Sequence, residues 1–154
     1  MGLKGLRIVE RDDISYFMNE TATRGGIASL STGGSGVSMD QAANVVTYAA
    51  NSSGKVPVGL LQNDVVNIDL TRQLLNIHKD EVQLGGKVTL TLRGMHVTDF
   101  VVGSPSAGAK AYLNSSGYIG TVWLSDLVNP PVGRFMTSKD ENNFVKVEIN
   151  LPQV

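Results

Sequence analysis

Strict alternation between apolar and polar residues is the feature of this sequence that most limits its fold. Val66, Ile68 and Leu70 are apolar, and the residues between them are Asn and Asp. The same alternation runs through residues 88–92 and 145–149. Successive side chains of a β-strand point to opposite faces, so a period of two predicts antiparallel strands with one buried face.

Short β-branched runs, separated by turn residues, extend this prediction to most of the chain. Asn51-Ser-Ser-Gly54, Asn114-Ser-Ser-Gly117 and Asp140-Glu-Asn-Asn143 each stand between two such runs. They predict β-hairpins, because Gly and Asn tolerate positive φ. For residues 70–78 a strand followed by a loop fits better than a helix. The expected all-β, antiparallel fold has strands at residues 26–30, 45–49, 56–61, 65–70, 87–92, 110–113, 118–122, 132–135 and 144–151.

The first 24 residues differ from the rest of the chain. They are richer in charge, contain the aromatic pair Tyr16 and Phe17, and end in Arg24-Gly25-Gly26, a composition typical of a flexible hinge. Two interpretations remain open for them. One is an extended N-terminal arm, residues 1–24, that docks on a neighbouring subunit, and the other is an ordinary first strand with its loop. Residues 25–154 are expected to form one domain.

Composition excludes several classes of protein. The formal net charge of −1 gives no electrostatic footprint for nucleic acid, and the absence of cysteine excludes disulfides and thiolate metal sites. No apolar run reaches the length needed to span a membrane. Only 18% of the residues are charged, which argues against a disordered chain.

No motif in the sequence predicts catalysis. His78 and His96 are the only histidines, and His96 with Asp99 alone is too few ligands for a metal site. No serine stands in a nucleophile elbow, and Gly33-Gly-Ser-Gly36 lacks the Lys of a phosphate-binding loop. We therefore expect a protein that is not an enzyme and has no cofactor. Trp123 fits either a core or an interface, and Arg72, Arg93 and Arg134 fit surface or inter-subunit ion pairs.

Several segments, taken in order, resemble a known class of protein. These are Asp69-Leu-Thr-Arg-Gln73, the stretch from His78 to Val88 that contains Gly-Gly-Lys-Val, Val132-Gly-Arg-Phe135, and the run that begins at Asp140. Together they are similar to the capsid decoration (cement) proteins of tailed bacteriophages, including cyanophages. The resemblance covers residues 24–151 and its motifs are structural.

The resemblance implies a small β-barrel or β-tulip-like domain that forms a homotrimer. Such a protein, made in the bacterial cytoplasm, binds the outer capsid surface of the virion. It bridges subunits of the major capsid protein and stabilises the expanded shell, without contact with nucleic acid or membrane. The residues we expect at capsid or inter-subunit contacts are Tyr16, Phe17, Arg24, Val66, Ile68, Leu70 and Arg72.

Two other functions stay open. A fibre, baseplate or carbohydrate-binding module for host attachment would need an exposed aromatic platform, and the chain has nine aromatic residues (four Phe, four Tyr and one Trp) to build one. A small hydrolase or metal-dependent enzyme would need convergent histidine and acidic side chains.

Overall fold

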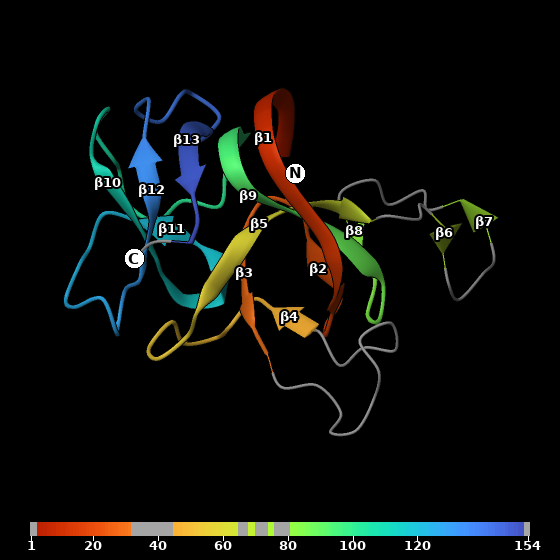
Figure 1. Ribbon diagram of the computed structural model, residues 1–154. Coiled ribbons are helices and arrows are strands. Elements are labelled where there is room, and N and C mark those ends of the chain that lie inside the picture. Colours follow the sequence, from red (N-terminus) through yellow and green to blue (C-terminus); the bar gives the residue numbers. More distant parts are fainter. Residues whose placement is uncertain (1–2, 32–44, 65–67, 70–73, 76–80, 153–154) are drawn as a thin grey trace.

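The chain is all-β, as the alternation predicts. The computed structural model describes residues 3–31, 45–64, 68–69, 74–75 and 81–152 (Figure 1). One turn of 3-10 helix, Ser115–Gly117, is the only helical element in these ranges. The strands are β1 Leu3–Met18, β2 Ala22–Thr23, β3 Ile27–Leu30, β4 Val45–Thr47, β5 Pro57–Asp64, β6 Ile68–Asp69, β7 Leu74–Leu75, β8 Glu81–Val82, β9 Lys87–Thr98, β10 Lys110–Leu113, β11 Ile119–Gly120, β12 Pro131–Phe135 and β13 Val145–Asn150.

Nine of these strands form one sheet. Its order is β1-β4-β3-β5-β9-β13-β12-β10-β11, and β1 also pairs with β9. The extra pairing closes β1, β4, β3, β5 and β9 into a ring, here called the five-strand ring. Strands β13, β12, β10 and β11 continue the sheet outward from β9 (Figure 1). Two short pairs, β2 with β8 and β6 with β7, lie outside this sheet.

Strand β9 joins the ring to the rest of the sheet. One edge of β9 pairs with β1, from Leu3 opposite Thr98 to Phe17 opposite Lys87. The other edge changes partner along its length: the first half pairs with β5, and the second half, from Arg93 onward, pairs with β13. A single strand therefore fixes β1, β5 and β13 relative to one another.

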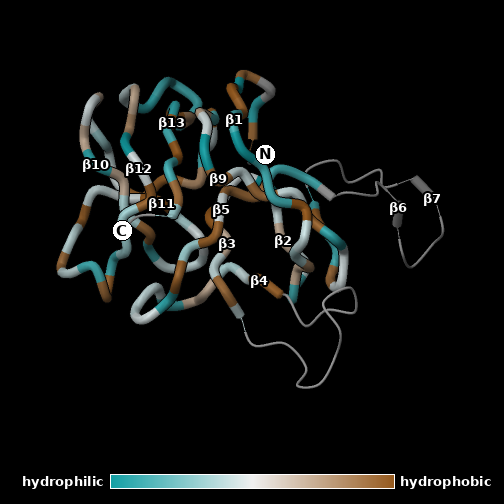
Figure 2. The backbone as a smooth tube through the Cα atoms, viewed as in Figure 1, coloured by the Kyte–Doolittle hydropathy of each residue, from teal (hydrophilic) through white to brown (hydrophobic). Residues whose placement is uncertain are grey.

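Two hydrophobic cores lie on opposite sides of β3 and β5. Ile27 of β3 and Leu60 of β5 belong to one core, with Phe135 and Ile149 from the outer strands. Their neighbours Ala28 and Leu61 belong to the other, with Met18, Val46, Val82, Val88 and Leu90. Both faces of these strands are buried, and apolar segments follow the strands through the centre of the molecule (Figure 2). Burial of each such side chain contributes roughly 1.5–3 kcal/mol.

The structure confirms two of the three predicted hairpins. Residues 114–117 connect β10 to its antiparallel partner β11, and residues 140–143 lie between the antiparallel strands β12 and β13. At the second, Asn143 has a φ of 67° and the Asp140 Oδ1 atom accepts hydrogen bonds from the backbone N–H groups of Asn142 and Phe144, each at 2.9 Å. The hairpin predicted at residues 51–54 is wrong, because β3 lies between β4 and β5 and pairs with both.

The segment expected as an arm is a strand of the main sheet. Residues 3–18 form β1, which pairs with β9 along most of its length. Of the two interpretations, these residues therefore fit the ordinary first strand. At its end, Phe17 and Met18 pair with β4 in parallel. The expectation of a purely antiparallel sheet is therefore wrong at this point. Four antiparallel pairings lead around the five-strand ring from β1 through β9, β5 and β3 to β4, so β1 and β4 run in the same direction where they meet.

The predicted hinge at Arg24-Gly25-Gly26 is also wrong. Gly25 and Gly26 are buried, and the Gly25 N–H donates to the Leu61 carbonyl at 3.0 Å. The Tyr48 hydroxyl donates to the Thr23 carbonyl at 2.6 Å and accepts from the Gly26 N–H at 3.0 Å. Here glycine serves close packing, since a Cβ on Gly26 would lie 2.9 Å from the Tyr48 and Phe100 rings.

Gly94 occupies the place where β9 changes its partner from β5 to β13. Its φ is 155°, a conformation that residues with a side chain rarely adopt. A Cβ there would overlap the Ile8 carbonyl oxygen of β1 and lie 3.2 Å from the Val9 Cα. Glycine is therefore required for the close approach of β1 to β9.

Replacing Gly94 with alanine should lower the free energy of unfolding by about 3 kcal/mol, through backbone strain and displacement of β1. Gly103→Ala is the matched control, because Gly103 also has a positive φ, 77°, but a Cβ added to it would meet no atom of a non-adjacent residue within 4 Å. That control should cost only about 1 kcal/mol. Denaturant unfolding measures both, and equal losses would contradict the role given to Gly94.

Candidate binding surface

The predicted contact residues do not come together in one site. Tyr16 is half-buried and packs against the core that contains Met18, Val88 and Leu90. The centre of the Phe17 ring lies 5.8 Å from the Lys87 Nζ atom. Arg24 is half-buried in the turn before β3. Ile68 lies in β6, whose backbone pairs with β7. Val66, Leu70, Arg72 and His78 lie outside the described residues.

A row of exposed apolar side chains on β1 was not predicted from the sequence. Leu6 is 70% exposed, Ile8 and Ile14 are more than half exposed, and Val9 is partly exposed. We call these four residues the β1 surface. Only Arg7 separates Leu6 from Ile8, a spacing of two that equally fits a buried strand face. The exposure of both side chains in the folded chain distinguishes the two cases.

The backbone of β1 has an open edge beside this surface. Within the described residues, β1 pairs with β9 on one edge, and on the other only Phe17 and Met18 pair with β4. Its pairing with β9 shifts register at four points, and Leu6 lies in the first of these irregular stretches, between Lys4 and Ile8. Bulges and charges are common devices that protect an open edge against unspecific pairing, while a partner of matching shape can still add to it.

The outer face of the sheet carries rows of side chains that cross several strands. Lys110 of β10 is opposite Arg134 of β12, and Arg134 is opposite Glu148 of β13. Glu148 is opposite Met95 of β9, which in turn is opposite Ile8 of β1. This continuous row links the β1 surface to the far side of the sheet.

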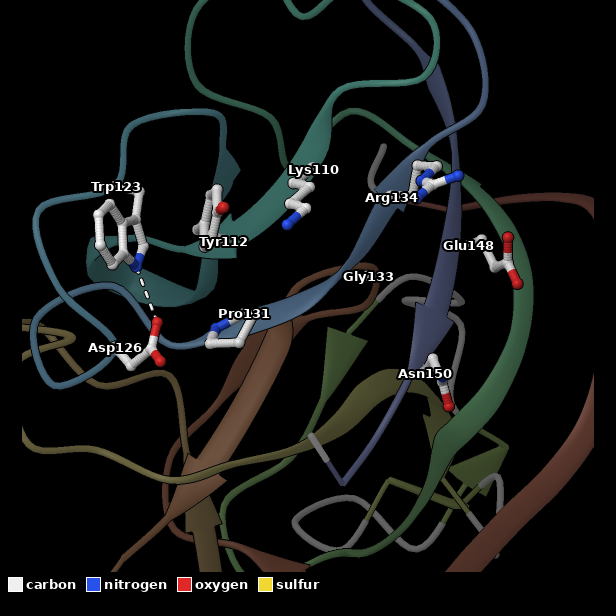
Figure 3. Close-up of a pocket in the computed structure, with 9 residues that line it drawn as sticks. All are labelled: Lys110, Tyr112, Trp123, Asp126, Pro131, Gly133, Arg134, Glu148 and Asn150. Atoms are coloured by element: carbon white, nitrogen blue, oxygen red, sulfur yellow. Dashed lines mark hydrogen bonds between the residues drawn. The ribbon is translucent and has the colours of Figure 1, made fainter. Parts of the chain in front are cut away.

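An open hollow of about 690 Å³ lies at the β10 end of this row. Figure 3 shows Trp123 and Tyr112 on one side of it, with Arg134 and Glu148 on the other. Trp123 is 52% exposed, and its indole N–H donates to Asp126 Oδ1 at 2.8 Å. The residues that line the hollow are Lys110, Tyr112, Trp123, Asp126, Pro131, Gly133, Arg134, Glu148 and Asn150.

The loop between β11 and β12, residues 121–130, is here called the Trp123 loop. A smaller hollow of about 360 Å³ is lined in part by Asp126, Leu127 and Pro130 of this loop. It is mainly apolar and includes the exposed side chains of Val56 and Leu127. The two loops that form it are joined by hydrogen bonds from the Gly54 N–H to the Leu127 carbonyl, at 2.7 Å, and from the Ser52 hydroxyl to the Val128 carbonyl, at 2.7 Å. Its prolines are Pro57, Pro130, Pro131 and Pro152.

His96 is buried and belongs to a polar network that reaches Asp12 of β1. Its Nε2 atom lies 2.8 Å from the Thr91 hydroxyl, which lies 3.4 Å from Asp12 Oδ1, and the Gln62 amide donates to the same carboxylate oxygen at 2.6 Å. If the Thr91 hydroxyl donates to Asp12, it accepts from His96 Nε2–H, and Nδ1 is then the unprotonated nitrogen. Nδ1 is buried without a hydrogen-bond partner.

The structure gives two further findings about possible sites. Within the described ranges, no three His, Cys, Asp or Glu side chains are grouped so that they could hold a metal ion. In the same ranges, no helix is long and apolar enough to cross a membrane.

Comparison with families of known proteins and with curated proteins finds no match to this chain.

Burial makes protonation of His96 unfavourable and lowers its pKa from 6.5 to about 4, with a smaller contribution from the Arg7 charge. Between these values the unfolded chain binds more protons than the folded one, so stability increases with pH. The contribution of His96 is complete above pH 6.5 and is lost as the pH falls to about 4, a change of about 3 kcal/mol. We expect His96→Gln to flatten the pH dependence of the unfolding free energy over this window. Parallel curves for the two proteins would contradict this.

Proposed function

We propose that this chain is a structural virion protein that binds the outer surface of a phage capsid, bridges subunits of the major capsid protein and stabilises the expanded shell. The observation that carries the proposal is the combination of an open strand edge and four exposed apolar side chains on β1. The order of sequence segments that resembles phage decoration proteins supports the same function.

The β1 surface has the properties of a docking site for another protein. N–H and C=O groups on the edge of β1 that no described strand pairs with can form main-chain hydrogen bonds with a strand of the capsid protein. Burial of Leu6, Ile8 and Ile14 adds a hydrophobic contribution, roughly 25 cal/mol for each Å² of apolar surface removed from water. Exposed apolar side chains close together in the chain, such as Leu6 and Ile8, are typical of interaction surfaces in many soluble proteins.

Docking through β1 would orient the rest of the molecule. β10 is separated from β1 by β9, β13 and β12, or about 19 Å along the sheet at about 4.8 Å between neighbouring strands. With the β1 edge on the shell, β10 and β11 are at the side that faces away from it.

Stabilisation of the shell follows from linkage. A protein that binds only the expanded lattice lowers the free energy of that lattice and not of its dissociated subunits. Weak contacts repeated by the symmetry of the shell add up to strong overall binding. A homotrimer, which we also propose, would place three β1 surfaces on the shell at once, and light-scattering mass of the purified protein measures this state.

We expect the double variant Leu6→Asp/Ile8→Asp to lose binding to expanded capsids of the phage that encodes the protein. Each change places a charge where an apolar side chain would be buried, which should weaken binding at least tenfold. Cosedimentation with expanded capsids measures it, and unexpanded capsids should bind neither protein. Leu84→Asp is the control, because Leu84 is 61% exposed in the turn between β8 and β9, which meets β1 at Met18, beyond the four residues of the β1 surface.

Circular dichroism and thermal unfolding separate loss of binding from loss of the fold. If Leu6→Asp/Ile8→Asp stays folded and binds expanded capsids as tightly as the unchanged protein, the β1 surface is not the docking site. If the unchanged protein ignores expanded capsids, the proposed function itself is wrong.

A further inference from the structure

The Trp123 loop exposes large apolar side chains, although surface loops are usually polar. Its exposed apolar residues, each with more than half of its surface in contact with solvent, are Val122, Trp123, Leu124 and Leu127. Leu124 reaches 71% exposure. Large apolar side chains that are exposed so close together in the chain are typical of a surface that a second molecule covers.

Hydrogen bonds anchor this loop, so its apolar side chains are presented by an ordered backbone. The buried Asn129 side chain donates to the Leu113 carbonyl and accepts from the Leu124 N–H, both at 3.2 Å. The Trp123 indole N–H donates to Asp126 Oδ1 at 2.8 Å (Figure 3). A surface that is ordered before binding loses little conformational entropy when a partner covers it.

The apolar hollow of about 360 Å³ that adjoins the loop suits an aliphatic side chain. Four of the residues that line it are prolines, which have no backbone N–H, and the Gly54 N–H already donates to the Leu127 carbonyl at 2.7 Å. The hollow therefore offers few donors to a polar ligand, whereas Val56 and Leu127 offer exposed apolar surface. A leucine or valine side chain of a second molecule is the kind of group that fills it.

The charges at this surface fit a second copy of the same chain. Lys55 and Asp126 both line the hollow, both are exposed, and they are the only charged residues among those that line it. In a contact between two copies, each of these charges can face the opposite charge of the neighbour. A partner with a strong net charge of either sign would meet repulsion from one of them.

The exposed apolar area is also of the size that a contact between copies needs. The side chains concerned are Val56, Val122, Trp123, Leu124 and Leu127. If residues of this size each have about 150–250 Å² to expose, their exposed fractions come to about 500 Å². A standard interface buries about 800 Å² on each partner, of which about 65% is apolar in homodimers, so about 500 Å² of apolar surface is sufficient.

We propose that a second copy of this chain covers this surface, with residues 122–124 of one copy packed into the apolar hollow of the next. A contact between two different surfaces of one chain can repeat around a ring. Closed after three copies, the ring is the homotrimer proposed above, and only this number rests on the proposed function. The contact itself joins free copies and needs no capsid.

The test uses the free protein. Light scattering over a range of concentrations measures the mass of the particles, and we expect more than one chain in each particle at high concentration and dissociation on dilution. Trp123 is the only tryptophan, so its fluorescence reports on this loop. Association should protect the indole from quenching by acrylamide, because the neighbouring copy covers it.

Two variants test the two halves of the contact. Leu124→Asp changes the loop and Val56→Asp changes the hollow, and each should weaken association at least tenfold, because a charge replaces an apolar side chain that becomes buried. An equal mixture of the two should associate more strongly than either alone, since the intact loop of one meets the intact hollow of the other. All the changed side chains are exposed, so circular dichroism should show an intact fold.

Two further variants are matched controls, because they place the same charge on exposed apolar residues elsewhere. Leu84→Asp and Leu6→Asp/Ile8→Asp should leave the mass of the free protein unchanged. Loss of association in Leu6→Asp/Ile8→Asp, with none in Leu124→Asp or Val56→Asp, would place the contact between copies on β1 and overturn the proposal.

Other results would also overturn it. They are a mass of one chain at every concentration, association that neither Leu124→Asp nor Val56→Asp weakens, and a mixture of these two variants that associates no better than each alone. If the free protein is a monomer and Leu124→Asp weakens its binding to capsids, the surface belongs to the capsid protein. Failure of capsid binding would leave the association of free copies unaffected, so the two proposals fail separately.

Discussion

The structure depends on the pairing of one strand, β9, with three others. β1 occupies one of its edges, while β5 and β13 share the other. The change of partner near Arg93 and Gly94 lets one chain build both a closed ring and an open extension of the sheet. The cost is local: Gly94 must adopt a φ of 155°, which only glycine tolerates easily, so that β1 can lie close enough to β9.

This arrangement also determines which surfaces are left for binding. β1 is held along one edge by β9, while among the described strands only β4 pairs with its second edge, at Phe17 and Met18, and the side chains of Leu6, Ile8 and Ile14 are exposed. At the other side of the sheet, Lys110 of β10 and Arg134 of β12 line the polar hollow, with Trp123 and Arg134 on opposite sides of it (Figure 3). The same sheet thus separates a docking edge from a polar hollow, and this separation would let a bound molecule face both the capsid and the outside.

Local patterns predicted most strands and the partners of two hairpins, but not the pairings between strands far apart in the chain. The alternation at residues 145–149 predicts β13 correctly, with Val145, Val147 and Ile149 buried. The turn at residues 51–54 shows the limit, because turn composition does not reveal that β3 inserts between the two strands it connects. The hinge at Gly25 and Gly26 is wrong for a related reason: glycine can serve flexibility or close packing, and only the position of Tyr48 decides between them. The candidate sites were hardest to predict, since the β1 surface repeats the pattern of a buried strand face and the hollow combines residues from β10, the Trp123 loop, β12 and β13.

Hydrogen–deuterium exchange of the protein, free and bound to expanded capsids, tests the central claim most directly. The account predicts that amides of residues 3–14 on the open edge of β1 exchange quickly in the free protein, because none of the described strands pairs with them there, and become protected on the capsid. Amides that join β9 to β5 and β13 should be slow in both states. Unchanged exchange in β1, with protection instead at the Trp123 loop or at the apolar hollow around Val56 and Leu127, would contradict the claim that β1 is the docking strand.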